Sequence, residues 1–166
     1  MNLDKFYEYL NLSLKENDVV VTDGGGAFFE PMQNIAMKQG MRFVVSAYGT
    51  MGWALPAAIG TWFANPTDRI ICIVGDGGFQ LNIQELQTIV HHQIPLKIFY
   101  MNNGGYKTIH DTQKKYFQRF IGESKATGIS FPEIEKIAKA YGLLYTLDLM
   151  WAFYQTTPVI CEIKLS

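Results

Sequence analysis

Short runs of apolar, β-branched residues alternate with helical patterns along this chain. Most of the runs are continuously apolar, which is typical of strands covered on both faces. The expected strands are Asp18–Thr22, Arg42–Ser46, Arg69–Val74, Leu96–Met101 and Pro158–Lys164. This alternation predicts an α/β fold, a single-domain parallel sheet of about five or six strands with helices on both faces.

Spacing and capping signals mark the expected helices. The first carries one apolar stripe at helical spacing, formed by Leu3, Phe6, Leu10 and Leu14. Asn82 with Glu85, and Ser130 with Glu133, have the spacing of capping pairs before further apolar stripes. The apolar patch at residues 149–154 is interpreted as a shortened helix packed on the core, with a partner-binding surface as the alternative.

Composition excludes several classes of protein. The 166 residues carry a formal net charge of -1 and no basic block, so nucleic acid is not an expected partner. The longest apolar stretch, residues 50–64, is too short and too interrupted to span a membrane, and Met1–Lys5 lacks a signal-peptide pattern. Cys72 and Cys161 lie in apolar runs and are expected to be small core residues. We therefore expect a cytoplasmic protein without a membrane partner.

Glycine-rich loops follow four of the expected strands. They are residues 23–26 (DGGG), 47–52 (AYGTMG), 75–78 (GDGG) and 102–106 (NNGGY). Ligands of open parallel sheets bind outside the carboxyl ends of the strands, where these loops should meet. The sequence therefore predicts a cofactor site at this edge of the sheet.

Two of these loops carry oxygen ligands. Glycines let backbone N–H groups approach phosphate, but the carboxylate of Asp76 would repel phosphate unless a cation lay between them. Asn103 follows 27 residues later, after the next strand. With the carbonyl of Gly105, these side chains would supply three of the six oxygens that Mg²⁺ prefers. Each loop alone is typical of an ordinary turn, and the two together favour a magnesium and diphosphate site. The dinucleotide-binding alternative is disfavoured because GxGxxG lacks its third glycine.

The segment GDGGFQLNIQELQTIVHHQIPLKIFYMNNGGY, residues 75–106, resembles the thiamine-diphosphate binding motif. DVVVTDGGG, SAYGTMGWALPAAIG, SFPEIEKIAKAYG and PVICEI resemble other parts of the same domain, so the resemblance covers nearly the whole chain. The chain resembles the diphosphate-binding (C-terminal) domain of the thiamine-diphosphate-dependent enzymes, in the acetolactate-synthase-like and 2-oxoacid decarboxylase group. The resemblance implies that residues 1–166 form this domain and that the pyrimidine-binding domain is absent from the chain.

The resemblance implies thiamine diphosphate and Mg²⁺ as cofactors. Asp76, Asn103 and Gly105 would hold the metal. The implied cofactor-binding residues are Gly49, Met51, Gly75, Asp76, Gly77, Gly78, Asn103, Gly105 and Tyr106.

Individual roles follow from the same resemblance. The N–H groups of Gly77, Gly78 and Tyr106 would line the diphosphate. The carbonyl of Gly49 would bond the 4'-amino group, and Met51 would support the V-shaped bend of the cofactor. The alternative for Met51, taken alone, is an ordinary core methionine.

The implied function is a component of an acetolactate-synthase-like enzyme, which decarboxylates a 2-oxoacid and transfers or releases the resulting carbanion or enamine. One alternative is the diphosphate-binding subunit of a two-subunit decarboxylase similar to sulfopyruvate or phosphonopyruvate decarboxylase. Another is a non-catalytic assembly domain. The activating glutamate is expected on a pyrimidine-binding partner domain or subunit, since neither Glu30 nor Glu85 belongs to that domain. We therefore expect a homo- or hetero-oligomer, and we expect the chain to be inactive without this partner.

Ile109 stands where pyruvate-decarboxylase-type relatives carry an acidic residue, which leaves room for carboligation. The neighbouring His110 is interpreted as either a proton donor or a polar surface group. His91 and His92 are expected at a helix end, in a structural role. Four further residues are candidates for shaping substrate choice at the rim of the cleft: Phe28, Phe29, Tyr48 and Lys107.

Overall fold

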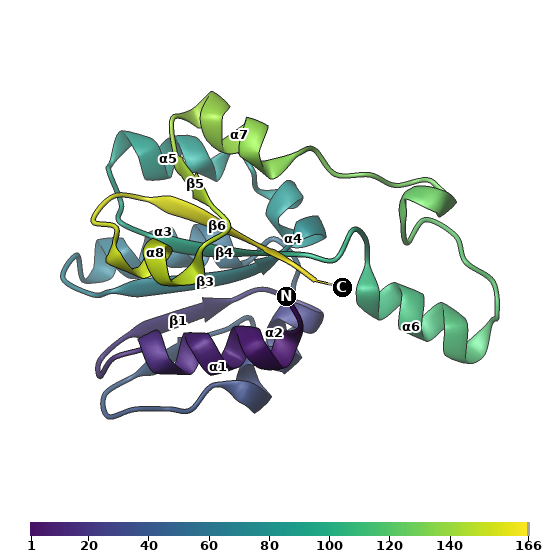
Figure 1. Cartoon of the computed structure of the whole chain (residues 1–166), viewed down its shortest axis with the longest axis horizontal. Coiled ribbons are helices and arrows are strands. Elements are labelled where there is room, and N and C mark those ends of the chain that lie inside the picture. Colours follow the sequence, from purple (N-terminus) through teal and green to yellow (C-terminus); the bar gives the residue numbers. More distant parts are fainter. Residues whose placement is uncertain (166) are drawn as a thin grey trace.

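Six parallel strands form one open sheet in the order β2-β1-β3-β4-β6-β5 (Figure 1). The structure, a computed structural model, describes residues 1–165, with the exception of the Phe28 side chain. The strands are β1 Val19–Thr22, β2 Arg42–Val44, β3 Ile70–Gly75, β4 Lys97–Asn102, β5 Leu144–Thr146 and β6 Val159–Lys164. The predicted α/β fold is confirmed. The five expected strands are present with ends shifted by up to two residues, and β5 was not expected.

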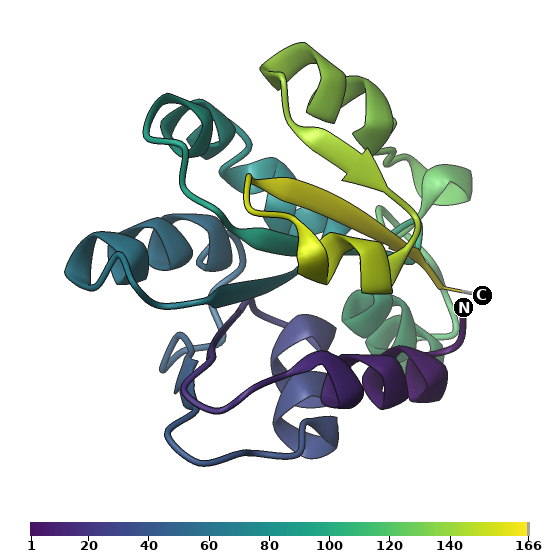
Figure 2. The same ribbon diagram turned by 60° about the vertical axis from the view of Figure 1, so that its left-hand side comes forward.

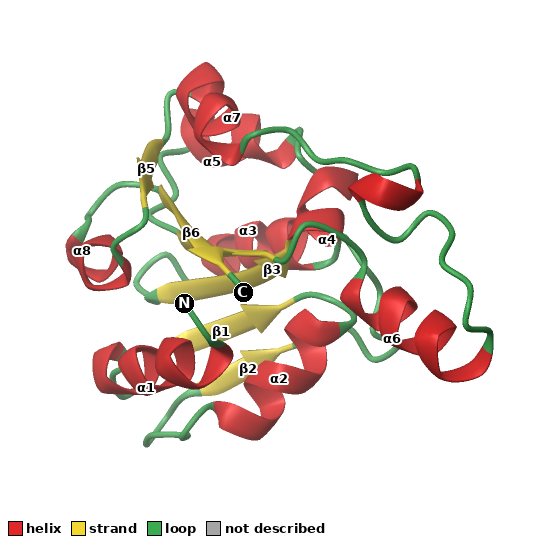
Figure 3. Ribbon diagram, turned by 45° about the vertical axis from the view of Figure 1, so that its right-hand side comes forward, coloured by secondary structure: helices red, strands yellow, loops and turns green. Residues whose placement is uncertain are grey.

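Helices cover both faces of the sheet (Figure 3). They are α1 Leu3–Ser13, α2 Gly26–Asn34, α3 Ala54–Ala64, α4 Asp76–Leu81, α5 Glu85–His91, α6 Lys107–Tyr116, α7 Ile134–Tyr141 and α8 Leu149–Tyr154, with one 3-10 turn, η1 Lys125–Thr127. Val19 and Val21 of β1 pack in the core under α3, α5 and α7. Val20 packs in the second core, under α1 and α8. Because both faces are buried, the strands need continuous apolar runs.

The two capping predictions are wrong. Asn82 is the residue that ends α4, and α5 begins only at Glu85 without a side-chain cap. The Asn82 side chain instead donates to the carbonyl of Gly52 at 2.7 Å. Helix α7 begins after Glu133, and Ser130 does not cap it. In the first case a long-range contact replaces the local hydrogen bond that the capping pattern predicts.

Several other predictions are confirmed. Phe6, Leu10 and Leu14 of the first stripe are buried. Residues 149–154 form the short helix α8, which packs on the second core. Cys72 and Cys161 are both free and buried. None of the described helices is long and apolar enough to cross a membrane.

The carboxyl edge of the sheet also gathers the ends of the chain. The two termini lie side by side in both views (Figures 1 and 2). The amino group of Met1 donates to the carbonyl of Lys164 at 2.7 Å. Helix α6 stands apart from the helical layers, and none of its described residues is buried (Figures 1 and 3). The region between α1 and α6 is where the predicted site lies.

Candidate cofactor site

A cleft of about 550 Å³ opens at the carboxyl edge of the sheet. Its walls include residues 24–27 after β1, residues 75–78 after β3 and residues 105–109 after β4. From β1 the chain continues to β2 in one direction along the sheet, and from β3 it continues to β4 in the opposite direction. The cleft therefore lies at a topological switch point between β1 and β3. The predicted meeting of the glycine-rich loops is confirmed.

Asp76 is the first residue of α4 and lies in the wall of the cleft with 3% of its surface exposed. One carboxylate oxygen accepts the N–H of Gly77 at 2.8 Å, and the other accepts the N–H of Gly105 at 3.1 Å. Burial raises the pKa of Asp76, although these backbone hydrogen bonds oppose the shift. No basic side chain among residues 1–165 forms an ion pair with it. A buried carboxylate in this setting fits a bound cation.

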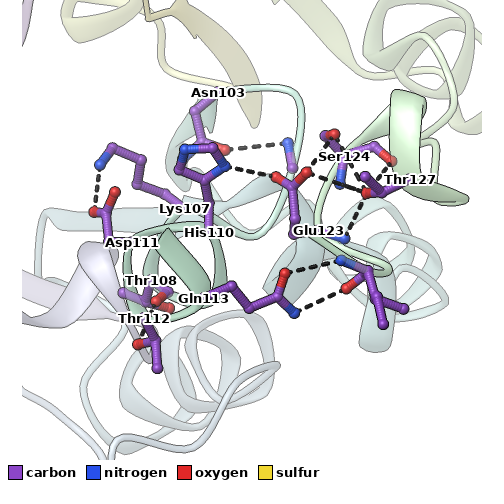
Figure 4. A network of polar contacts seen from close by, with 12 residues as sticks. Asn103, Lys107, Thr108, His110, Asp111, Thr112, Gln113, Glu123, Ser124 and Thr127 are labelled. Atoms are coloured by element: carbon purple, nitrogen blue, oxygen red, sulfur yellow. Dashed lines mark hydrogen bonds and ion pairs between the residues drawn. The ribbon is translucent and has the colours of Figure 1, made fainter. Parts of the chain in front are cut away.

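Asn103 completes a set of oxygen atoms around the same backbone amide. Its side-chain oxygen accepts the N–H of Gly105 at 3.2 Å (Figure 4), so the oxygens of Asp76 and Asn103 converge on one nitrogen. The neighbouring Asn102 donates instead to Glu162 at 2.6 Å. Within the described chain there is no cluster of three or more His, Cys, Asp or Glu side chains suited to a metal. A set of one carboxylate, one amide and one carbonyl fits Mg²⁺, which takes few protein ligands.

Close approach of the loops explains the glycines at two positions. A Cβ on Gly77 would overlap the ring of Tyr106 and lie 3.0 Å from the methyl carbon of Met51. A Cβ on Gly24 would overlap the carbonyl oxygen of Gly49, so the loops after β1 and β2 are in direct contact. Only glycine allows the backbone this close to its neighbours, and a phosphate needs the same closeness.

Met51 is the one residue of the second loop that lines the described cleft. Its side chain is 39% exposed, so it is not an ordinary core methionine. The loop that carries it is fixed by Asp23, whose carboxylate accepts the N–H groups of Gly52 and Ala54 at 3.1 Å each. Sequence reasoning placed Asp23 in the first glycine-rich loop but gave it no role.

The N–H group of Tyr106 differs from the expectation. It donates to the carbonyl of Glu123 at 2.8 Å and is therefore committed within the protein. Tyr106 still lines the cleft, with its ring beside Gly77. This contact joins residues 17 positions apart in sequence, and no local pattern signals it.

His110 does not line the cleft. Its Nδ1 lies 3.0 Å from a carboxylate oxygen of Glu123 (Figure 4). Its ring stacks on Phe120. Hydrogen bonds from Ser124, His110 and Thr127 lower the pKa of Glu123. The geometry therefore favours a structural role for His110 over a proton donor.

Of the other residues predicted at the rim, some line the cleft and some do not. Lys107 and Phe29 line the cleft, whereas Tyr48 is 94% exposed and does not. The Phe28 side chain lies outside the described residues. His91 and His92 lie at the end of α5, as predicted.

Sequence reasoning missed the part of the wall that comes from the chain ends, and from α2 it missed Glu30. Helix α1 contributes Asp4 and Tyr7, α2 contributes Glu30, and Leu165 follows β6. Burial and the charge of Glu30 raise the pKa of Tyr7. The stripe on α1 predicted a buried face, but nothing in the sequence placed that helix beside the cofactor loops.

An open parallel sheet, with a glycine-walled cleft at its switch point and a buried carboxylate without an ion pair in the cleft wall, defines a cofactor-binding α/β domain. The family model for the thiamine pyrophosphate enzyme, C-terminal TPP binding domain, matches residues 23–150, and the chain belongs to this family.

The chain is similar to large subunits of acetolactate synthase. It is 40% identical over 123 residues to the acetolactate synthase large subunit of Cyanidium caldarium, covering 74% of this chain and 21% of the relative. It is 38% identical over 126 residues to the acetolactate synthase isozyme 2 large subunit of Escherichia coli (strain K12), covering 75% and 23%. A probable acetolactate synthase large subunit of Methanococcus aeolicus is 31% identical over 137 residues, covering 80% and 22%. The chain thus spans less than a quarter of the length of these relatives.

Proposed function

We propose that this chain is the diphosphate-binding half of an acetolactate-synthase-like enzyme that binds thiamine diphosphate with Mg²⁺. Residues 1–166 act as one domain, and a pyrimidine-binding domain or subunit completes the site in an oligomer. Family membership and the names of the relatives support the cofactor and the class of enzyme. The observation that carries the proposal is the convergence of the Asp76 and Asn103 oxygens on the N–H of Gly105.

Different residues of the cleft would bind the metal, the diphosphate and the rest of the cofactor. Asp76, Asn103 and the carbonyl of Gly105 hold the metal, and Gly77 and Gly78 leave room for the diphosphate. Met51 and Gly49, from the second loop, position the rest of the cofactor. When bound, thiamine diphosphate supplies the carbon nucleophile and the electron sink for cleavage of a 2-oxoacid. The chain would bind and orient it in the cleft at the carboxyl edge of the sheet.

The reaction we propose is decarboxylation of a 2-oxoacid, followed by transfer or release of the remaining fragment. The side chain at position 109, an apolar isoleucine, lines the cleft. His110 is turned toward Glu123. Neither residue offers the acid that a simple decarboxylase would use there, which favours transfer to a second substrate.

Calorimetric titration with inorganic diphosphate tests the metal site, because that half of the site lies within this chain. The wild-type chain is expected to bind diphosphate with Mg²⁺ and to lose binding in EDTA. Asp76→Ala is expected to abolish magnesium-dependent binding. Asp111→Ala is the matched control, since Asp111 lines the same cleft outside the proposed ligand set. Unchanged affinity in Asp76→Ala, or equal binding in EDTA, would contradict the proposal.

A further inference from the structure

We propose that Asp23 and Asn82 are positioning residues that clamp Gly52 from two sides and so fix Met51 within the cofactor cleft. The inference rests on the proposed function of the cleft and extends it to residues that touch no cofactor. Asp23 is a buried carboxylate, and Asn82 is the asparagine that does not form the predicted helix cap.

The clamp acts on both polar groups of Gly52. Its N–H donates to Asp23 at 3.1 Å, and its carbonyl accepts the side-chain N–H of Asn82 at 2.7 Å. Gly52 is buried, with φ of 79°, a conformation that side chains rarely adopt. A Cβ there would lie 3.0 Å from both Asn82 and Leu81, so the loop packs tightly against α4 at this point. Met51 is joined directly to this immobilised residue.

Asp23 anchors the clamp to the scaffold. It follows β1 directly, is 2% exposed, and its second oxygen accepts the N–H of Ala54, the first residue of α3. A carboxylate at the start of an 11-residue helix is favoured by the helix dipole and satisfies an otherwise unpaired N–H. No basic side chain in residues 1–165 pairs with Asp23. A buried charge held only by loop and helix amides is typical of a positioning role.

Asn82 connects the clamp to the metal half of the site. It ends α4, the helix that begins at Asp76. The Met51 methyl lies close to Gly77, on the first turn of that helix, and Tyr106 approaches the same point. Through Asn82, one rigid unit therefore carries both the proposed metal ligand and the loop beneath the organic part of the cofactor. The spacing between them is fixed before any cofactor binds.

Methyl-labelled methionine NMR on the unliganded chain tests the clamp, with Met51→Leu used to assign the resonance. Asn82→Ala is expected to shift the Met51 methyl resonance and lower its order parameter. Asn65→Ala is the matched control: Asn65 is exposed, ends α3 at its far end, and its side chain donates to Asp68. That variant should leave the Met51 methyl unchanged.

Binding separates positioning from a merely structural role. Asn82→Ala is expected to weaken binding of thiamine diphosphate with Mg²⁺ by about three- to tenfold, the loss of one hydrogen bond, and to leave inorganic diphosphate binding unchanged. Asp23→Asn has one acceptor where two are needed and should give the same methyl change in the folded chain. If Asp23→Asn does not fold, the Asn82→Ala variant alone tests the clamp.

An unchanged Met51 methyl in folded Asn82→Ala would overturn the clamp, as would equal weakening of both diphosphate ligands. Failure of the wild-type chain to bind either ligand with Mg²⁺ would sink the proposed function instead. The methyl measurement does not depend on that result, so the two failures are distinguishable.

Discussion

Replacing Gly105 by alanine should separate the two loops that form the metal site. Gly105 pairs with Ser124 in an isolated antiparallel bridge, and a Cβ on Gly105 would overlap the carbonyl oxygen of Glu123.

 
That Cβ would also lie 3.2 Å from the carbonyl carbon of Glu123 and 3.3 Å from the Cα of Ser124. To relieve the overlap, the two loops must move apart by about 1 Å, which costs about 1–3 kcal/mol as overpacking. The same movement lengthens the hydrogen bond from Tyr106 to Glu123, now 2.8 Å, and adds about 1 kcal/mol. We expect the free energy of unfolding to fall by about 2–4 kcal/mol.

Binding should suffer more than stability, because Gly105 orders the proposed ligands. Its N–H holds both Asp76 and Asn103, and its carbonyl is the third proposed oxygen. Octahedral Mg²⁺ tolerates little displacement, so magnesium-dependent affinity for inorganic diphosphate should fall by at least about tenfold. Urea unfolding and calorimetry measure the two effects.

Gly104→Ala is the matched control. A Cβ on Gly104 meets nothing within 4 Å, and its φ of 74° leaves backbone strain of about 1–2 kcal/mol as the main cost. This variant should lose stability but keep diphosphate binding. If Gly105→Ala bound diphosphate like the wild type, with an unchanged unfolding midpoint, the close junction of these loops would be refuted.

Three further predictions concern charged groups. Burial, together with the charge of Arg69, lowers the pKa of Lys97 to about 8; the unfolded chain then binds more protons above that pH, so stability should rise by up to about 2 kcal/mol between about pH 8 and 9.5. Lys97→Met should flatten this rise in urea titrations, and an equal slope in both proteins would contradict the assignment. Arg69 pairs at 2.5 Å with Asp18, which is 2% exposed; Arg69→Met should cost about 3–5 kcal/mol by chemical denaturation, and a cost below about 1 kcal/mol would count against a buried pair. His110→Ala should leave magnesium-dependent diphosphate affinity unchanged in calorimetry, because the ring faces Glu123; a large loss of affinity would show that His110 reaches the cleft.

The sequence predicted the part of the fold that depends on burial alone. Continuous apolar runs identified the strands that are covered on both faces, because such runs have few other stable environments. Strand β5 has only three residues, lies at the sheet edge, and begins with Leu144, which is 39% exposed. None of its three residues is fully buried, so β5 does not show the buried run of strands such as β3 and β4. The capping pattern at Asn82 failed because its side chain bonds to Gly52, a residue 30 positions away.

The same division holds for the site. Asp76 and Asn103 were found because each follows a strand, and parallel strands bring such residues to one edge. Asp4 and Tyr7 were missed because their place depends on how α1 docks beside the ends of β3 and β4. The commitment of the Tyr106 N–H to Glu123 was missed for a similar reason, since the partner comes from a loop beyond α6.

Asp23 and Asp76 present the same chemistry in two settings, and the difference between them decides their roles. Each directly follows one of two neighbouring central strands, β1 and β3. Each is almost fully buried and accepts two backbone N–H groups. Burial raises the pKa of both carboxyl groups. Only Asp76 lines the described cleft, however, where we propose that the cation binds. The two oxygens of Asp23 accept the N–H groups of Gly52 and Ala54, and Asp23 does not line the cleft. One carboxylate is therefore suited to a cation, and the other to holding the loop in which the rest of the cofactor would rest.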